Sequence, residues 1–161
     1  MTEDTTEYSA AVPGMIEILL VEDSPGDVRL TQEALKAAKI LNRLSVVPDG
    51  IEGLAFLRRE GKYLNAPKVQ LVLLDLNLPK MNGREVLQKI KSDSQLQHIP
   101  VVILTTSKNE VEVLESYRLH ANCFITKPVD FSQFLNVIKA IEGFWLTVVD
   151  LPKADIKNKN A

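Results

Sequence analysis

Residues 69–83 read VQLVLLDLNLPKMNG, and this stretch decides the fold. A short, continuous run of Val and Leu leads to Asp75, and the chain then breaks through Asn77, Pro79 and Gly83. An apolar run of this length predicts a strand covered on both faces, as in the middle of a parallel sheet. Asp75 then lies at the carboxyl edge of the sheet, where open α/β folds bind ligands. The alternative is a turn residue that only bonds its own backbone.

The composition limits the possible classes of protein. The chain has 161 residues, 45% of them hydrophobic, and a net charge of −2. These values predict one globular domain over residues 15–146, between a flexible arm at 1–14 and an extension and tail at 147–161. We expect no nucleic-acid partner, no membrane segment and no export, because no basic excess, long apolar run or signal pattern is present. The single cysteine, Cys123, cannot form an internal disulfide and fits the cytoplasm.

Strand and helix patterns alternate along the chain. Apolar runs of strand length at 16–21, 44–47, 101–104 and 121–126 accompany the one that ends at Asp75. Helical patterns follow at Pro25 behind the N-cap Ser24, at 51–57 with Ile51 among its apolar residues, and at 84–91, 110–119 and 131–145. A polar connector spans 58–68. Five strands alternating with five helices predict an α/β fold with a doubly wound parallel sheet.

Chemically distinctive residues follow the ends of four of the predicted strands. Glu22 and Asp23 follow the first, Asp75 ends the third, Thr105 follows the fourth and Lys127 the fifth. Because parallel strands end at one edge, we expect these side chains to lie together. Three close carboxylates need a cation, and oxygen ligands suit Mg²⁺. A lysine and a threonine beside them can hold the oxygens of a phosphoryl group.

Each of these residues also has an ordinary structural explanation. Glu22 and Asp23 could simply favour the positive end of the following helix, and Thr105 could merely end a strand. Lys127 could be a surface lysine, and Phe124 a ring of the core. The joint occurrence of all of them at strand ends favours a functional site.

Four strings in fixed order resemble a known family. ILLVEDSPGD at 18–27, LVLLDLNLPKMNG at 71–83, VVILTTS at 101–107 and FITKP at 124–128 are similar to the receiver domains of two-component response regulators. The resemblance covers about residues 15–145. It implies a flavodoxin-like (βα)5 sheet with strand order 2-1-3-4-5, and a phosphoacceptor signalling protein rather than an enzyme.

The resemblance also assigns roles at the carboxyl edge. It makes Asp75 the phosphoacceptor, which takes its phosphoryl group from a phosphohistidine of a sensor histidine kinase. The residues that bind Mg²⁺ are Asp23, Asp75 and the backbone carbonyl of Asn77, with Glu22 acting mainly through a metal-bound water. Asn77 and Ser107 are expected to tune autodephosphorylation.

A second set of roles concerns the conformational switch. By the same resemblance, Lys127 pairs with the phosphoryl group and its bond to Pro128 is a cis peptide. The hydroxyl of Thr105 binds a phosphoryl oxygen, and the ring of Phe124 follows it inward. The result is a two-state switch biased by new charge.

The C-terminal part of the sequence indicates how the protein passes on its signal. Only 16 residues follow Trp145, so we expect a receiver that stands alone and signals by protein contact or phosphorelay. The predicted helix at 131–145 has a wider apolar arc than one sheet-facing stripe needs. We therefore predict a homodimer that uses Val137, Phe144, Trp145 and Val148. The alternative is that the C-terminal segment covers Val137 and Phe144 within one monomer.

Three further strings are similar to a smaller group within this family. LTTSKNE at 104–110, SYRLHANCFITK at 116–127 and GFWLTVVDLP at 143–152 are similar to the small response regulators of cyanobacterial phytochrome kinases. This similarity implies a light-sensing, bilin-binding kinase as the partner.

Two other classes of protein share part of the pattern. An aspartate-nucleophile phosphatase of the haloacid dehalogenase type needs a second Asp two residues after the first, where this chain has Asn77. A flavodoxin-type flavin domain needs a hydroxyl-rich and glycine-rich loop after the first strand. This chain has Glu22 and Asp23 there, which are unsuited to a bound anion.

Overall fold

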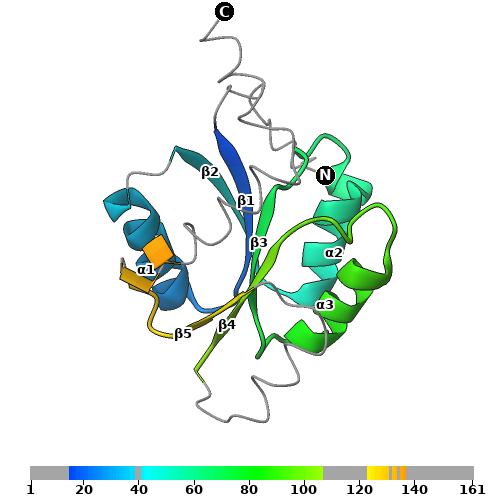
Figure 1. The fold of residues 1–161 in the computed structure, drawn as a ribbon. Helices are drawn as coiled ribbons and strands as arrows, with labels where there is room; N and C mark the ends of the chain where they lie inside the picture. Colours follow the sequence, from blue (N-terminus) through cyan, green and yellow to red (C-terminus); the bar gives the residue numbers. More distant parts are fainter. Residues whose placement is uncertain (1–14, 39–40, 107–122, 131, 134, 137–161) are drawn as a thin grey trace, which may run out of the picture.

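The computed structural model describes residues 15–38, 41–106, 123–130, 132–133 and 135–136. The elements, in chain order, are β1 Ile16–Val21, α1 Pro25–Ala37, β2 Asn42–Val47, α2 Gly50–Arg58, the 3-10 turn η1 Gly61–Tyr63, β3 Leu71–Asp75, α3 Gly83–Ser92, β4 Val101–Thr105 and β5 Cys123–Thr126. The strands form one parallel sheet in the order β2-β1-β3-β4-β5, as predicted. Helix α1 covers one face of the sheet, and α2 and α3 lie on the other (Figure 1).

The core consists of two apolar clusters, one on each face of the sheet. Side chains alternate between the faces along each strand, so Leu19 of β1 belongs to the cluster with α2 and α3, and Leu20 to the cluster with α1. All five residues of β3 are buried. The apolar run that opened the sequence analysis is therefore a central strand with a neighbour on each side.

The strand register places Asp75 at the carboxyl edge. Asp75 is paired with Leu104 of β4, and Leu74 with Val21 of β1. Consequently the residues that follow β1 and β4 lie beside Asp75. The charged and hydroxyl residues predicted to share one edge do follow these strands.

Helix starts are fixed at the same edge by side-chain caps. Ser24, Asp49 and Asn82 cap α1, α2 and α3 by accepting a backbone N–H three residues on. Gly83 begins α3 so close to β3 that a Cβ atom there would lie 2.3 Å from the carbonyl oxygen of Asp75. Only glycine allows this approach, which packs the start of α3 against the backbone of Asp75.

The structure differs from the sequence predictions in three details. Strand β2 begins at Asn42 rather than at 44, because Arg43 pairs in register with Glu17 of β1 and forms an ion pair with it. Ile51, expected on the apolar side of α2, is 51% exposed, whereas Phe56 is buried. The polar connector at 58–68 contains the turn η1.

Several predictions fall on other parts of the chain. The arm at 1–14, the helix at 110–119 and the extension at 147–161 lie outside the described residues. Of the predicted helix at 131–145, the described residues 132–133 and 135–136 are helical. None of the helices described here is long and apolar enough to cross a membrane.

Candidate functional site

Asp75 is the residue around which the site is built. It is the last residue of β3 and is only 4% exposed. Its Oδ1 atom accepts the backbone N–H of Asn77 at 3.1 Å. This bond is the local turn contact that the sequence alone also allowed, but it uses only one of the two carboxylate oxygens. The other oxygen, Oδ2, faces Lys127.

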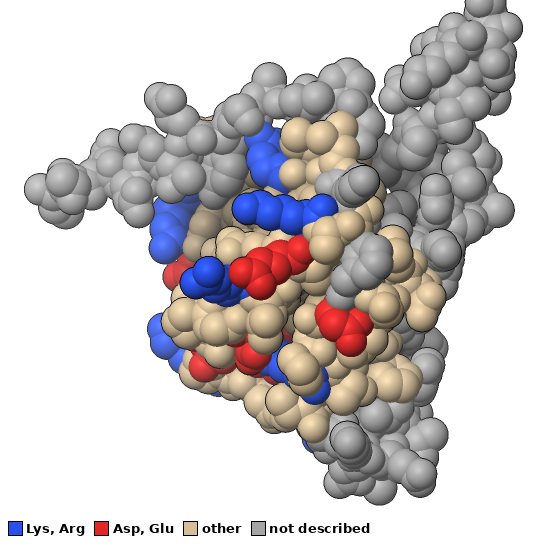
Figure 2. Space-filling model, turned by 90° about the vertical axis from the view of Figure 1, so that its left-hand side faces the viewer, with Lys and Arg blue, Asp and Glu red and all other residues tan. Residues whose placement is uncertain are grey.

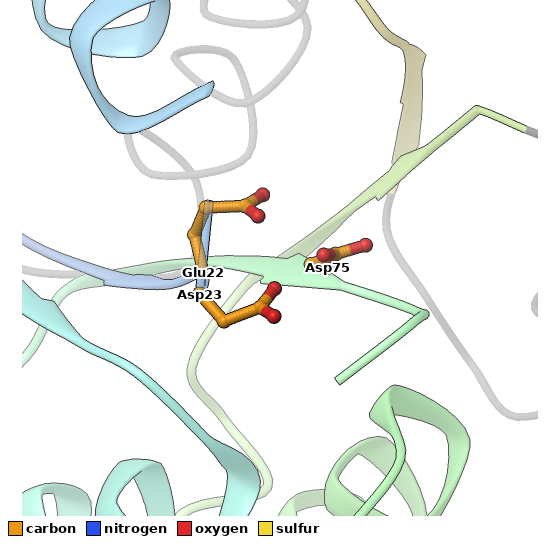
Figure 3. A group of neighbouring side chains, drawn as sticks. All are labelled: Glu22, Asp23 and Asp75. Carbon is orange, nitrogen blue, oxygen red and sulfur yellow. The ribbon is translucent and has the colours of Figure 1, made fainter. Parts of the chain in front are cut away.

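Three carboxylates meet at the carboxyl edge. Glu22 and Asp23 follow β1 and extend toward the side on which Asp75 lies (Figure 3). One oxygen from each of the three residues lies within 4.8 Å of the other two. Glu22 and Asp75 are buried, and Asp23 is exposed. A set of oxygen donors with one side open to water fits a hard divalent cation such as Mg²⁺, which keeps part of its water shell.

Lys127 places one ammonium group among these acids. Its Nζ lies 2.6 Å from Oε2 of Glu22, 3.1 Å from Oδ2 of Asp27 and 3.3 Å from Oδ2 of Asp75. The lysine side chain is only 7% exposed, which rules out the surface lysine considered from the sequence. An ammonium has three N–H donors, so the three carboxylates match its hydrogen-bonding capacity.

Burial and charge shift the acid–base behaviour of this group. Burial raises the pKa of Glu22, and the charge of Asp75 adds to this effect, while the hydrogen bond from Lys127 opposes it. Burial lowers the pKa of Lys127, but hydrogen bonds to Glu22 and Asp27 raise it more, so the net pKa lies above the usual value. The lysine is therefore charged at neutral pH, and the site has an excess of negative charge.

Thr105 and Phe124 lie on the strands next to Asp75. Thr105 ends β4 and is buried, and its carbonyl oxygen accepts the backbone N–H of Lys127 at 2.8 Å. Phe124 of β5 is half-buried and packs against the core cluster under α2 and α3. The peptide bond between Lys127 and Pro128 is cis, as predicted.

The structure brings the main predicted site residues together and adds one that the sequence analysis missed. Asp27, in the first turn of α1, contacts Lys127. The sequence did contain a signal for Asp27. A helix that starts at Pro25 places its first turn, which includes Asp27, at the same edge of the sheet as Asp75. Five predicted residues lie outside the described residues: Ser107, Val137, Phe144, Trp145 and Val148.

Charges on the face that carries α1 are mixed. Lys and Arg side chains alternate there with Asp and Glu (Figure 2). Arg29 and Glu33 of α1, for example, form an exposed ion pair one helical turn apart. The described part of this face therefore presents no single-sign patch.

A comparison with known protein families identifies the family of this chain. Residues 18–139 match the response regulator receiver domain, and the chain belongs to this family. Members of the family are signalling proteins that histidine kinases phosphorylate on an aspartate, and they bind a divalent metal. The phosphatase and flavodoxin alternatives are thereby excluded.

Individual relatives are similar over nearly their whole length. Response regulator Rcp1 of Synechocystis sp. is 51% identical over 137 residues, which is 85% of this chain and 93% of Rcp1. The crystal structure of the phosphorylated cyanobacterial phytochrome response regulator RcpA is matched with a TM-score of 0.71 at 51% identity, over 86% of this chain and 99% of RcpA. The Mn²⁺-bound form of Rcp1 is matched with a TM-score of 0.70 at 50% identity, over 85% of this chain and 99% of that one. This chain is thus a response regulator similar to those of cyanobacterial phytochromes, as the second set of strings predicted.

Proposed function

We propose that Asp75 accepts a phosphoryl group from a phosphohistidine of a sensor histidine kinase. A carboxylate oxygen of Asp75 attacks the phosphorus, the new O–P bond forms as the N–P bond breaks, and the imidazole leaves with the electron pair of that bond. The observation that carries the proposal is the position of Asp75, buried at a strand end with the Lys127 ammonium 3.3 Å away. The acyl phosphate formed is the signalling state.

The residues around Asp75 have different roles in phosphoryl transfer. Lys127 donates hydrogen bonds to the phosphoryl oxygens and offsets their charge. Glu22, Asp23, Asp75 and the backbone carbonyl of Asn77 would hold Mg²⁺, which would offset part of the negative charge of the phosphoryl group. Because these groups are already in place, the chain assists its own phosphorylation and dephosphorylation. Asn77 and Ser107 set the rate at which water removes the phosphoryl group.

The switch that reports phosphorylation involves β4 and β5. The Thr105 hydroxyl binds a phosphoryl oxygen and draws the following loop toward Asp75, and Phe124 moves inward behind it. The half-buried position of Phe124 supports this role, because a ring at the border of the core can pack in either of two positions.

The partner is a phytochrome-type histidine kinase in the cytoplasm. The similarity to RcpA, whose structure is described as that of a phytochrome response regulator, supports this assignment. The signal passes on through protein contact or phosphorelay. We include in the proposal a homodimer whose interface contains Val137, Phe144, Trp145 and Val148.

Phosphotransfer from a purified kinase tests the proposal. A cyanobacterial phytochrome kinase is autophosphorylated with labelled ATP, separated from the ATP and mixed with the wild-type protein, Asp75→Asn or Asp93→Asn. The wild type and Asp93→Asn should take up the label, because Asp93 pairs with Arg58 away from the site. Asp75→Asn should take up none.

Two results would contradict the proposal. Labelling of Asp75→Asn would place the phosphoacceptor elsewhere, and absence of labelling in the wild type with several phytochrome kinases would reject the partner. A sizing column run with and without beryllofluoride tests the dimer, and a monomer in both states would reject it.

A further inference from the structure

Asp27 occupies an unusual position for an acidic residue at a helix start. It is the third residue of α1, where a carboxylate commonly bends back to accept the N–H of the N-cap residue. In this structure the N–H of Ser24 donates to Oε1 of Glu22 instead, at 3.1 Å. The carboxylate of Asp27 is therefore not used to cap its own helix, and its Oδ2 atom accepts a hydrogen bond from Lys127 at 3.1 Å.

The backbone of Asp27 is held firmly on both sides. Its N–H donates to the hydroxyl of Ser24, and its carbonyl oxygen accepts the hydroxyl of Thr31 at 2.9 Å. The side chain is 33% exposed, whereas that of Lys127 is 7% exposed. Asp27 thus reaches from an anchored helix turn to a buried ammonium on the opposite side of the site.

The three carboxylates around Lys127 differ in their other tasks. Asp75 becomes the phosphorylated residue in the proposed function, and Glu22 belongs to the group that fits a divalent cation. Asp27 lies outside that group and does not touch the reacting atoms. Its bond to Lys127 can therefore persist while the other two carboxylates change partners.

A lysine side chain has four rotatable carbon–carbon bonds, so its ammonium needs fixed partners to stay in one place. In this structure the bonds to Glu22 and Asp27 hold Nζ at 3.3 Å from Oδ2 of Asp75. Glu22 is the nearest partner of the ammonium, at 2.6 Å, so we expect loss of the Asp27 carboxylate to let the ammonium shift toward Glu22 and away from Asp75.

We propose that Asp27 is a positioning residue for phosphoryl transfer, because its carboxylate holds the Lys127 ammonium where the phosphoryl oxygens arrive beside Asp75. This inference rests on the proposed function of Asp75. It adds a residue of α1 to the transfer machinery and makes the rate of phosphorylation depend on the first turn of that helix.

A double-mutant cycle separates positioning from a general effect of charge or helix stability. Phosphorylation by acetyl phosphate and Mg²⁺ is followed by intact mass for the wild type, Asp27→Asn, Lys127→Met and the double variant. Asp27→Asn should lower the initial rate about fivefold, the effect of one partly exposed charge-assisted hydrogen bond. In the Lys127→Met background the same change should alter the rate by less than about twofold, because its target is gone.

Glu33→Gln is the matched control. It also removes one carboxylate from α1, but Glu33 pairs with Arg29 on the exposed side. Its rate should equal that of the wild type. A rate for Asp27→Asn equal to or above the wild-type rate overturns the inference, as does an equal loss in both Lys127 backgrounds. A wild-type protein that acetyl phosphate does not phosphorylate on Asp75 overturns the proposed function instead.

The ammonium signal of Lys127 gives a second readout, independent of phosphorylation. A buried ammonium with three carboxylate partners exchanges its protons slowly and should give an observable ¹⁵N-correlated NMR signal. Asp27→Asn should shift or broaden this signal, and Glu33→Gln should leave it in place. An unchanged Lys127 signal in Asp27→Asn would show that the carboxylate does not hold the ammonium.

Discussion

Each of the two edges of the sheet contains a buried carboxylate in an ion pair, but the edges differ in charge balance. At the amino edge, one acid meets one base: Nε of Arg43 donates to Oε2 of Glu17 at 3.0 Å, and a second guanidinium nitrogen contacts the other oxygen. This paired geometry satisfies both carboxylate oxygens. The hydrogen bond to Glu17 raises the pKa of Arg43, so the guanidinium keeps its charge.

The carboxyl edge is arranged differently. A single ammonium, that of Lys127, contacts Glu22, Asp27 and Asp75, and Asp23 adds a further carboxylate nearby. One positive charge faces four negative charges, and burial raises the pKa of Glu22. The comparison shows that an acid and a base with matched charges need no further partner. The unmatched carboxylates at the carboxyl edge need more positive charge, which a divalent cation would supply in the proposed function.

The largest expected effect on stability comes from replacing the positively charged residue at each edge. Lys127→Met and Arg43→Met should each lower the free energy of unfolding by about 3 kcal/mol without metal, because each leaves buried carboxylates uncompensated. Added Mg²⁺ should restore much of the loss in Lys127→Met, since a bound cation replaces the missing charge. It should not reduce the difference between Arg43→Met and the wild type. Urea unfolding at several Mg²⁺ concentrations measures both.

If Mg²⁺ restored the two variants equally, the metal would not act at the carboxyl edge. The comparison would also fail if Lys127→Met were as stable as the wild type without metal, because the carboxylates would then not depend on the ammonium.

A smaller effect is expected from replacing one acid at each edge by its amide. Glu17→Gln breaks the matched pair and should lower the free energy of unfolding by about 2 kcal/mol. Glu22→Gln removes one of the excess charges while it loses a bond to Lys127, so the change in Mg²⁺-free stability should stay below about 1 kcal/mol. Its affinity for Mg²⁺ should fall about tenfold. Urea unfolding and a calorimetric Mg²⁺ titration give the two quantities. Equal losses of stability in the two variants would contradict the difference between the edges.

The smallest effect concerns pH. The folded state raises the pKa of Glu22 above its usual value of 4.5, so between these two values the folded protein binds more protons than the unfolded chain. Without metal, this residue therefore reduces stability as the pH rises from about 4.5 through the folded pKa. Glu22→Gln should remove this contribution. Unfolding free energies of the wild type and Glu22→Gln, measured across this range, should converge toward the acidic end. A difference that does not vary with pH would contradict the prediction.

The fold could be predicted because its signals are local. The apolar run before Asp75 is a strand whether or not other contacts are known, and parallel pairing then brings the other strand ends to the same edge. Leu104 pairs with Asp75 in register, so the position of Thr105 beside Asp75 follows. Four of the site residues were found in this way: Glu22, Asp23, Asp75 and Lys127.

Details that depend on packing could not be predicted from the pattern. Asp27 meets Lys127 across 100 positions of sequence, and the contact depends on how α1 sits on the sheet. Ile51 is exposed because Gly53 approaches β1 instead, where a Cβ atom would lie 3.1 Å from Val21. The spacing of apolar residues does not show which glycine of a helix packs closely against the sheet. The paired charges of Glu17 and Arg43 likewise extend β2 into a stretch that looks polar.

The most direct test of the central claim is to locate the phosphoryl group. The wild type and Asp75→Asn are incubated with acetyl phosphate and Mg²⁺, and intact mass is followed by peptide mapping. The account predicts one phosphoryl group per wild-type chain, on the peptide that contains Asp75, and none on Asp75→Asn. A phosphoryl group on Asp75→Asn, or a wild-type chain that gains none, would contradict it.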